Sequence, residues 1–318
     1  MARAALVAGD WGTSHLRLFL CADDGSLLAR ADGPGVAQAR SACADVLDRL
    51  LQPWSREHGD LPVVLCGMVG STVGWTLAPY VPCPAGIEDL AHGCVALRDE
   101  RLHIVPGVSC RNRLGAPDVM RGEETQIVGA MQLAADLARG RQLLCLPGTH
   151  TKWVLLEDGR VVELLTAPTG ELFALLREHS ILVGDAATAS GADTVTDGAG
   201  YQRGLSAAAA EPQADLLHRL FECRSRRLMG ELGATDSAAF LSGLLIGNDV
   251  AGALKLFASA RVPKRVPVIG APGLGALYAR ALAAQGREAP MLEGTAAALA
   301  GLVRLQQLLP EHSLTHGH

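Results

Sequence analysis

The 318-residue chain has few aromatic side chains, 4% of its residues, although 49% of its residues are hydrophobic. It lacks any apolar run approaching the roughly 18–20 residues that cross a membrane, and no signal-peptide core follows its first residues. It also lacks blocks of like charge, and its net charge of −5 argues against nucleic-acid binding. These absences favour a two-domain α/β protein packed with aliphatic side chains, without nucleic-acid or membrane partners.

Two familiar cysteine and glycine patterns are also missing. The eight cysteines are scattered and form no Cys-x-x-Cys pair, so their spacing does not indicate a zinc site. Several lie within apolar runs, as do the reduced, buried thiols of cytoplasmic proteins. No Gly-x-Gly-x-x-Gly opens a helix after the first expected strand, which argues against a Rossmann dehydrogenase.

What the chain does have is one pattern that occurs twice. Residues 6–20 and 143–156 each run from an apolar strand through a Gly-Thr turn into a second strand, followed by an Asp-Gly turn. The repetition predicts a duplicated fold whose turns face one another across a cleft. Glycine lets backbone N–H groups approach an anion, so the two turns would hold a polyphosphate. The alternative is that both are ordinary hairpins.

Glycine-rich and acidic segments follow other expected strands. The loop 67–75 comes after a buried strand at 61–66, at the sheet edge where ligands bind in open α/β folds. Trp75 in this loop would either stack on a ligand or fill a structural position. Glu123 and Glu124 begin a helix, where they either complement the helix dipole or supply a general base.

Three further segments lead to predictions for the second half of the chain. Thr169 is a candidate N-cap with Glu171 in the first helical turn, or both contact substrate. Residues 266–275 form a strand, a glycine turn and a helix, which would seat a nucleotide base or sugar. Residues 214–228 are expected to form one arginine-bearing helix that faces mostly solvent.

With these landmarks placed, the sequence resembles the 2-dehydro-3-deoxygalactonokinase family of the actin/hexokinase/Hsp70-like ATPase superfamily. The motifs that carry the resemblance stand in order along residues 5–305. They are Asp-Trp-Gly-Thr at 10–13, Gly-Met-Val-Gly-Ser at 67–71 with Gly-Trp at 74–75, Met-Arg-Gly-Glu-Glu-Thr-Gln at 120–126, Pro-Gly-Thr-His at 147–150 with Lys-Trp at 152–153, Thr-Gly-Glu-Leu at 169–172 and Leu-Ser-Gly-Leu-Leu-Ile-Gly at 241–247.

The resemblance implies ATP-dependent phosphorylation of the C6 hydroxyl of 2-dehydro-3-deoxy-D-galactonate (EC 2.7.1.58), in galactonate degradation. It implies an α/β fold of duplicated actin-like, ribonuclease H-like domains flanking a central cleft. We expect an N-terminal domain over residues 1–138, joined by a returning helix at 294–309, a C-terminal domain over 139–293, and a flexible tail over 310–318. A homodimer is left open.

Site residues follow from the matched motifs. The resemblance assigns ATP and Mg²⁺ binding to the two turns and the adenosine loop, with Asp10 as the metal ligand: Asp10, Gly12, Thr13, Ser14, Gly148, Thr149, Gly270 and Gly273. The sugar acid would be bound by a second set: Gly70, Ser71, Trp75, Arg121, Glu123, Lys152, Thr169 and Glu171.

The catalytic base is either Glu124 or Asp10. The second turn has no aspartate to take this role, and Asp10 is better suited to Mg²⁺. Arg121, Lys152 and Arg17 are the candidate cations for the substrate carboxylate. Two other enzymes fit the same pattern: a kinase for another small sugar acid, and an exopolyphosphatase-like phosphohydrolase that shares the Glu-Glu helix.

Overall fold

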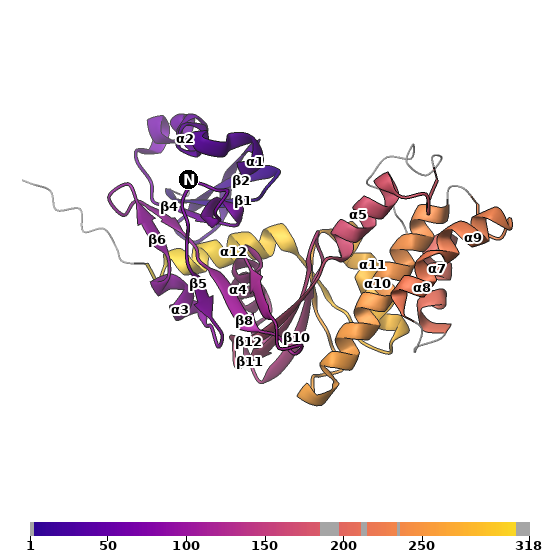
Figure 1. The fold of residues 1–318 in the computed structure, drawn as a ribbon. Coiled ribbons are helices and arrows are strands. Elements are labelled where there is room, and N and C mark those ends of the chain that lie inside the picture. The colour runs from indigo at the N-terminus through magenta and orange to yellow at the C-terminus, as the bar shows by residue number, and fades with distance from the viewer. Residues whose placement is uncertain (1–2, 185–196, 211–214, 234–235, 310–318) are drawn as a thin grey trace, which may run out of the picture. The chain divides into compact units, whose positions relative to one another are not determined.

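The computed structural model describes residues 3–184, 197–210, 215–233 and 236–309 (Figure 1). The expected tail at 310–318 lies outside the described residues. By its contacts the chain divides into two compact units, each described here by itself. Unit 1 comprises Met1–Gly140, Leu156–Leu164 and Gly294–His318, and unit 2 comprises Arg141–Leu155 and Leu165–Glu293.

Unit 1 is built on a six-stranded mixed sheet with the strand order β3-β2-β1-β4-β7-β6. Its strands are β1 (Ala4–Trp11), β2 (His15–Ala22), β3 (Leu27–Pro34), β4 (Val63–Cys66), β6 (Val95–Leu97) and β7 (Leu102–Ile104). The hairpins β1–β2 and β2–β3 are antiparallel, whereas β1–β4 and β4–β7 are parallel. A separate three-stranded sheet has the order β5-β8-β9, from β5 (Tyr80–Pro82), β8 (Gly107–Arg111) and β9 (Pro117–Met120).

Unit 2 repeats this plan in a five-stranded sheet with the order β12-β11-β10-β13-β14. Its strands are β10 (Arg141–Leu146), β11 (Thr151–Glu157), β12 (Arg160–Ala167), β13 (Val268–Gly270) and β14 (Met291–Glu293). In both sheets the first strand of the unit is central, its hairpin partners lie on one side, and strands in parallel pairing lie on the other. In unit 1 the edge strand β6 adds an antiparallel pair with β7. The duplication expected from two Gly-Thr hairpins is therefore present in the sheet topology.

Helices cover these sheets. Unit 1 contains α1 (Val36–Ala39), α2 (Cys43–His58), α3 (Ile87–His92), α4 (Glu123–Leu133) and α12 (Gly294–Gln306), with short 3-10 turns η1 (Arg40–Ala42), η2 (Met68–Gly70) and η3 (Ala135–Ala138). Unit 2 contains α5 (Thr169–His179), α7 (Ala199–Ala210), α8 (Leu216–Leu220), α9 (Glu222–Leu228), α10 (Ser237–Leu256) and α11 (Pro272–Ala284), with the 3-10 turn η5 (Ala258–Ala260).

In unit 1, α4 and α12 cross at glycines that leave no room for a side chain. A Cβ on Gly129 would lie 1.7 Å from the carbonyl oxygen of Ala297, and one on Gly301 would lie 2.0 Å from that of Thr125. Such contacts let the two backbones touch, and α12 packs in addition against β1. The last described helix of the chain is thereby an integral part of the first unit.

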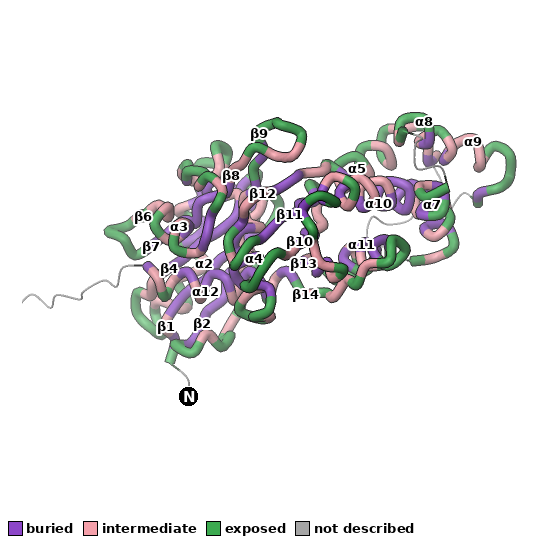
Figure 2. Tube along the Cα trace, turned by 90° about the horizontal axis from the view of Figure 1, so that it is seen from below, coloured by how far each residue is buried: buried purple, intermediate pink, exposed green. Residues whose placement is uncertain are grey.

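Unit 2 contains the equivalent crossing between α7 and α10. A Cβ on Gly204 would lie 2.2 Å from the Phe240 carbonyl oxygen, and one on Gly243 would lie 2.2 Å from that of Tyr201. Both units therefore use paired glycines to bring two helices into backbone contact. Figure 2 shows buried residues following the central strands and α10. Helix α10 is long and apolar enough to cross a membrane. However, 61% of its apolar 18-residue stretch is buried inside the fold, as is typical of a core helix.

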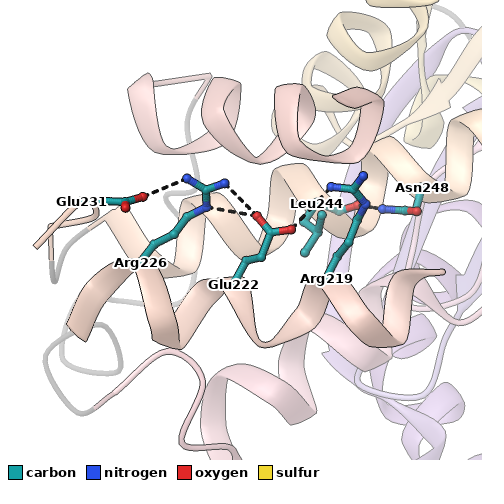
Figure 3. A network of polar contacts seen from close by, with 6 residues as sticks. All are labelled: Arg219, Glu222, Arg226, Glu231, Leu244 and Asn248. Atoms are coloured by element: carbon teal, nitrogen blue, oxygen red, sulfur yellow. Dashed lines mark hydrogen bonds and ion pairs between the residues drawn. The ribbon is translucent and has the colours of Figure 1, made fainter. Parts of the chain in front are cut away.

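The expected arginine-bearing helix at 214–228 is interrupted. The structure has two short helices, α8 and α9, separated at Phe221. Arg219 is only 7% exposed and lies 3.4 Å from Glu222, which also accepts from Arg226 at 2.8 Å (Figure 3). The expectation of a mostly solvent-facing arginine face is therefore wrong for Arg219, whose guanidinium is buried in an ion-pair chain.

Candidate active site

The first hairpin tip, between β1 and β2, is seated on the start of α1. The backbone N–H of Ala37 donates to the carbonyl oxygen of Thr13 at 3.1 Å, and Val36 donates to Gly12 at the same distance. Gly35 precedes the helix, and a Cβ there would lie 2.2 Å from the Thr13 carbonyl oxygen. The tip is thereby fixed through its carbonyl groups, while the side chains of Thr13 and its neighbour Ser14 remain exposed.

The second hairpin tip, between β10 and β11, is seated in the same way on the start of α5. The N–H of Glu171 donates to the carbonyl oxygen of Thr149 at 2.9 Å. A Cβ on Gly170 would lie 2.4 Å from the Gly148 carbonyl oxygen, so glycine is required at this contact. The carboxylate of Glu171 also lies 2.8 Å from a ring nitrogen of His150. The two tips therefore share a backbone construction as well as a sequence pattern.

Unit 2 contains a cavity of about 630 Å³ that reaches the second tip. Five residues expected from the sequence line it: Gly148, Thr149 and Gly273, which were expected to bind ATP, and Thr169 and Glu171, which were expected to bind the sugar acid. Gly270, the last residue of β13, does not line the cavity. The next residue, Ala271, does line it. Apolar side chains that the sequence did not single out form much of the wall: Phe173, Leu175, Leu245, Ile246 and Leu277.

A half-buried carboxylate, Asp249 of α10, connects the elements behind this cavity. It accepts hydrogen bonds from Trp153 Nε1 at 2.8 Å, Thr169 Oγ1 at 2.7 Å and Tyr278 Oη at 2.6 Å. Tyr278 Oη also lies 2.7 Å from Thr151 Oγ1. Burial raises the pKa of Asp249, and the three donors oppose that rise. One side chain thus connects β11, α5, α10 and α11.

The structure corrects the expectation for Thr169 and shows the surroundings of Lys152. Thr169 is not an N-cap, because it is the first residue of α5, its side chain makes no capping bond, and its hydroxyl donates to Asp249 instead. Lys152 is 6% exposed, and its ammonium donates to Thr166 Oγ1 at 2.9 Å. Lys152 does not line the cavity.

In unit 1, Glu124 lies in the first turn of α4 and is 1% exposed. The N–H of Gly122 donates to both of its carboxylate oxygens, at 2.9 and 2.7 Å, and Thr125 Oγ1 lies 3.2 Å from one of them. Gly122 has a φ of 107°, which a side chain would strain. Burial, and then the neighbouring charge of Glu123, raise the pKa of Glu124 to about 8.

Asp10 lies at the end of β1, beside the loop that begins at Gly67. A Cβ on Gly67 would lie 3.3 Å from Asp10 Oδ1, and one on Gly122 would lie 3.5 Å from the Gly67 Cα. Gly67 therefore separates the segments that bear Asp10 and Glu124. Burial raises the pKa of Asp10, and Arg17, 3.3 Å from its Oδ2, opposes that rise.

The loop after Gly67 brings further expected residues to this region. Ser71 Oγ donates to the Met68 carbonyl oxygen at 2.7 Å, so its hydroxyl stabilises the loop. Trp75 is half-buried against the core of unit 1, with the Arg98 guanidinium 5.2 Å from the ring centroid. These contacts give Trp75 the structural position that was one of its two expected roles.

Arg121 lies close to the same loop. Its Nη2 donates to the Ala78 carbonyl oxygen at 2.8 Å, and its guanidinium covers the Tyr80 ring at 4.4 Å. A Cβ on Gly70 would lie 2.9 Å from Arg121 Nη1. Nε and Nη1 of Arg121 have no hydrogen-bond partner among the described residues. Glu123 accepts from the Arg121 N–H at 3.1 Å.

Residues 10–305 match the family described as 2-keto-3-deoxy-galactonokinase. The chain belongs to this family. The 2-dehydro-3-deoxygalactonokinase of Escherichia coli (strain K12) is 36% identical over 301 residues, which are 94% of this chain and 96% of that protein. DgoK1 of Rhizobium meliloti (strain 1021), whose assignment to the same activity is provisional, is 40% identical over 304 residues, 93% of this chain and 94% of that protein.

Solved structures agree with this family. The crystal structure of a protein from Sinorhizobium meliloti that is provisionally assigned as a 2-dehydro-3-deoxygalactonokinase has a TM-score of 0.85 at 37% identity. The match covers 95% of this chain and 98% of that protein's chain. An activator of 2-hydroxyisocaproyl-CoA dehydratase from Clostridium difficile, solved with bound ADPNP, has a TM-score of 0.50 at 12% identity, covering 97% of this chain and 96% of that one, and shows the fold alone.

The 2-keto-3-deoxy-galactonokinase family therefore confirms the resemblance, the actin-like fold and the EC 2.7.1.58 kinase activity expected from the sequence. Membership implies an ATP-dependent kinase with a sugar-acid substrate. What the sequence did not reveal was Asp249 and the apolar wall of the cavity. A charged residue within the apolar stretch of α10 was the available signal, since such a residue is rarely buried unless it is paired.

Proposed function

We propose that this chain transfers the γ-phosphoryl group of ATP to the C6 hydroxyl of 2-dehydro-3-deoxy-D-galactonate, with unit 2 binding the nucleotide and unit 1 acting on the sugar acid. The observation that carries the proposal is the cavity of about 630 Å³ that is bordered by the Gly148–Thr149 tip. Its volume lies within the roughly 300–1,000 Å³ of small-molecule sites, and its walls are mainly apolar.

The nucleotide site is supported by the chemistry of the cavity. The base and ribose would lie against Phe173, Leu245 and Leu277, and the phosphates against the tip. Gly148 keeps the tip free of side-chain atoms where a phosphate approaches, and the Thr149 hydroxyl is an additional donor. Asp249 would act from behind the wall, because Thr169 and Tyr278 line the cavity and both donate to it.

Asp10 fits the role of a Mg²⁺ ligand. Carboxylate oxygen is the donor that Mg²⁺ prefers, and one or two carboxylates with phosphate oxygens and waters complete its usual shell. No group of three or more His, Cys, Asp and Glu side chains capable of holding a metal occurs within the described ranges, so Asp10 would be joined by phosphate and water oxygens. Bound there, Mg²⁺ would neutralise phosphate charge. Arg17, beside Asp10, would favour the ionised form of its carboxyl and so oppose the effect of burial.

Glu124 is the group we assign as general base. Its pKa of about 8 makes it a stronger proton acceptor than an ordinary carboxylate while leaving part of it ionised at neutral pH. Its position is fixed by the Gly122 N–H, so its carboxylate is directed before substrate arrives. Glu124 would accept the proton of the C6 hydroxyl as the phosphoryl group is transferred.

Arg121 is the cation we assign to the substrate carboxylate. Its guanidinium is held by Ala78 and Tyr80, and its Nε and Nη1 have no partner among the described residues. A carboxylate is the acceptor that such a guanidinium edge suits. Lys152 is a weaker candidate because its ammonium already donates to Thr166. We place the reaction in the cytoplasm, where ATP is available.

A coupled ADP-release assay over 2-keto-3-deoxy sugar acids tests the proposal. We expect turnover that requires the acid, with the C6-hydroxyl compound of galactonate configuration preferred over its C4 epimer. Equal rates with both epimers would replace this substrate by a broader sugar-acid class. Phosphate release from ATP or polyphosphate that is independent of any acid would support the phosphohydrolase alternative instead.

A further inference from the structure

Two cysteines lie side by side on neighbouring strands of the three-stranded sheet in unit 1. Strands β5 and β8 are parallel, with Pro82 opposite Ser109. Cys83 follows Pro82 and Cys110 follows Ser109, and the Cys83 N–H donates to the Ser109 carbonyl oxygen at 2.8 Å. The two thiols are close enough for each to shift the pKa of the other. Both side chains are partly exposed.

The surroundings of Cys110 favour its thiolate. The Cys83 thiol is a neighbouring polar group, and the backbone N–H of Leu164 donates to the Cys110 sulfur at 3.4 Å. The Cys83 thiol, and then the Leu164 N–H, lower the pKa of Cys110 to about 7, although burial and the charges of Asp118 and Glu163 oppose them. The thiolate is the form of cysteine that attacks an oxidant.

The other thiols of the protein have the opposite character. Burial raises the pKa of Cys21 to about 11 and those of Cys94 and Cys223 to about 12. Cys66 and Cys145 are buried, and their pKa values are raised well above the ordinary range. Burial raises the pKa of Cys43 as well. Cys110 is therefore the thiol of this chain best suited to react first, and Cys83 is the thiol beside it.

We propose that Cys83 and Cys110 form a reversible disulfide in response to hydrogen peroxide, with Cys110 attacking first and Cys83 resolving the product. The Cys110 thiolate displaces hydroxide from peroxide and becomes a sulfenic acid. The Cys83 sulfur then forms the S–S bond and displaces water, so that two thiols and one peroxide give one disulfide and two waters. A thiol reductant returns both residues to the reduced state.

The sheet geometry allows this bond. Neighbouring strands lie about 4.8 Å apart, and Cys83 and Cys110 occupy the positions just after a paired register. Disulfides require Cα atoms separated by about 4.4–6.8 Å, so no large backbone movement is needed. The Cys110 sulfur also contacts both the N–H and the carbonyl group of Leu164, which keeps it in place beside Cys83.

The test uses the full-length protein with one equivalent of hydrogen peroxide, followed by alkylation and peptide mass spectrometry without reduction. We expect a peptide joined through Cys83 and Cys110, loss of two of the eight thiols, and recovery of both on adding dithiothreitol. Cys83→Ser should accumulate a Cys110 sulfenic acid that dimedone captures. Cys110→Ser should lower the rate of thiol loss by about tenfold or more, as expected when the main thiolate is removed.

Cys94→Ser is the matched control, since Cys94 is also partly exposed but has a raised pKa. It should form the disulfide as the unaltered protein does. All three variants should retain ATP-dependent turnover, which shows that they fold. Both peptides recovered as free thiols while another cysteine is oxidised would overturn the proposal. Accumulation of sulfinic acid on Cys110 while Cys83 is intact would equally overturn it, because Cys83 would then not resolve the first product.

Discussion

Each unit contains a hydrogen-bonded carboxylate, buried in the case of Glu124 and half-buried in the case of Asp249, and the two are held in opposite ways. Asp249 in unit 2 accepts from three side chains on three other elements of secondary structure. Glu124 in unit 1 accepts from the backbone N–H of Gly122 and is contacted by Thr125, while Glu123 adds a like charge nearby. Burial raises the pKa of both groups.

The difference points to a structural role for Asp249 and a chemical role for Glu124. The hydrogen-bond capacity of Asp249 is used to join β11, α5 and α11 behind the cavity, so losing it should mainly affect folding and the shape of the proposed nucleotide site. Glu124 is held by neighbours in its own helical turn and is poised to exchange a proton, so losing it should mainly affect turnover. Four substitutions test this contrast.

The largest effect is expected from Glu124→Gln. The amide keeps the size of the side chain but accepts no proton, so kcat should fall by about 10²–10⁴-fold, the usual contribution of a general base. Coupled ADP release measures the loss, and Gln132→Ala, at an exposed position of the same helix, is the control, expected to retain most of the activity. Near wild-type turnover in Glu124→Gln, with none in Asp10→Asn, would transfer the role of base to Asp10.

The pH dependence of Glu124 provides a second readout. The base acts as the carboxylate, so kcat/KM of the unaltered enzyme should rise with pH and level off above about 8. Stability should move the other way. The folded pKa lies above the unfolded value, so stability present at about pH 4.5 is lost as the pH rises through 8. Glu124→Gln removes this loss, and its gain in Tm should therefore grow between pH 5 and 8.

Asp249→Ala should be the most damaging substitution for stability. It leaves the Trp153 Nε1 and the Thr169 hydroxyl without the acceptor that they share. Two buried donors without partners cost about 3 kcal/mol of unfolding free energy together. Urea denaturation measures the loss. Asp249→Asn, which keeps an acceptor oxygen, should lose less, and equal losses in both variants would show that charge rather than hydrogen bonding is what the fold requires.

Thr169→Val tests a single bond of the Asp249 cluster. Removing one hydroxyl donor should cost about 1 kcal/mol and loosen the start of α5, on which the Gly148–Thr149 tip rests. We expect a several-fold higher KM for ATP with little change in kcat or in KM for the sugar acid. Glu178→Gln, on the exposed face of the same helix, is the control. An increase confined to the sugar-acid KM would place Thr169 at the acceptor rather than at the nucleotide.

The smallest effect on stability is expected from Arg17→Met. The Arg17–Asp10 pair is partly exposed, with side chains 39% and 20% accessible, so its loss should change the unfolding free energy by less than about 1 kcal/mol. Arg17 opposes the raised pKa of Asp10, so its removal should raise that pKa further. The Mg²⁺ concentration for half-maximal activity should then increase most at low pH, and an unchanged Mg²⁺ requirement would argue against Asp10 as the ligand.

The sequence anticipated what depends on local pattern. Alternating apolar residues and Gly-Thr turns predicted two hairpins and a duplicated fold, which both sheets contain. The sequence also predicted that Gly148, Thr149 and Gly273 bind ATP, and these three residues line one cavity. The hairpin and fold predictions succeed because turn chemistry and strand periodicity act over a few residues.

Long-range contacts account for what the sequence missed. The sequence predicted that Thr169 caps its own helix, but its hydroxyl donates to Asp249, 80 positions further along the chain. Arg219 was expected on a solvent-facing helix, yet Glu222 and the packing of α8 bury it. Which buried charge finds a partner depends on how helices assemble, and this information is not contained in the spacing of residues within one helix.

The backbone contact between α4 and α12 has a consequence for the order in which a nascent chain matures. The residues that begin α4, including Glu124, are synthesised long before residues 294–306, yet Gly129 and Gly301 must meet before α4 is locked in place. A ribosome-bound chain that stops short of residue 294 would therefore contain the proposed base without its support. We expect such truncated chains to be protease-sensitive around residues 123–133 and to gain protection only after the final helix has emerged.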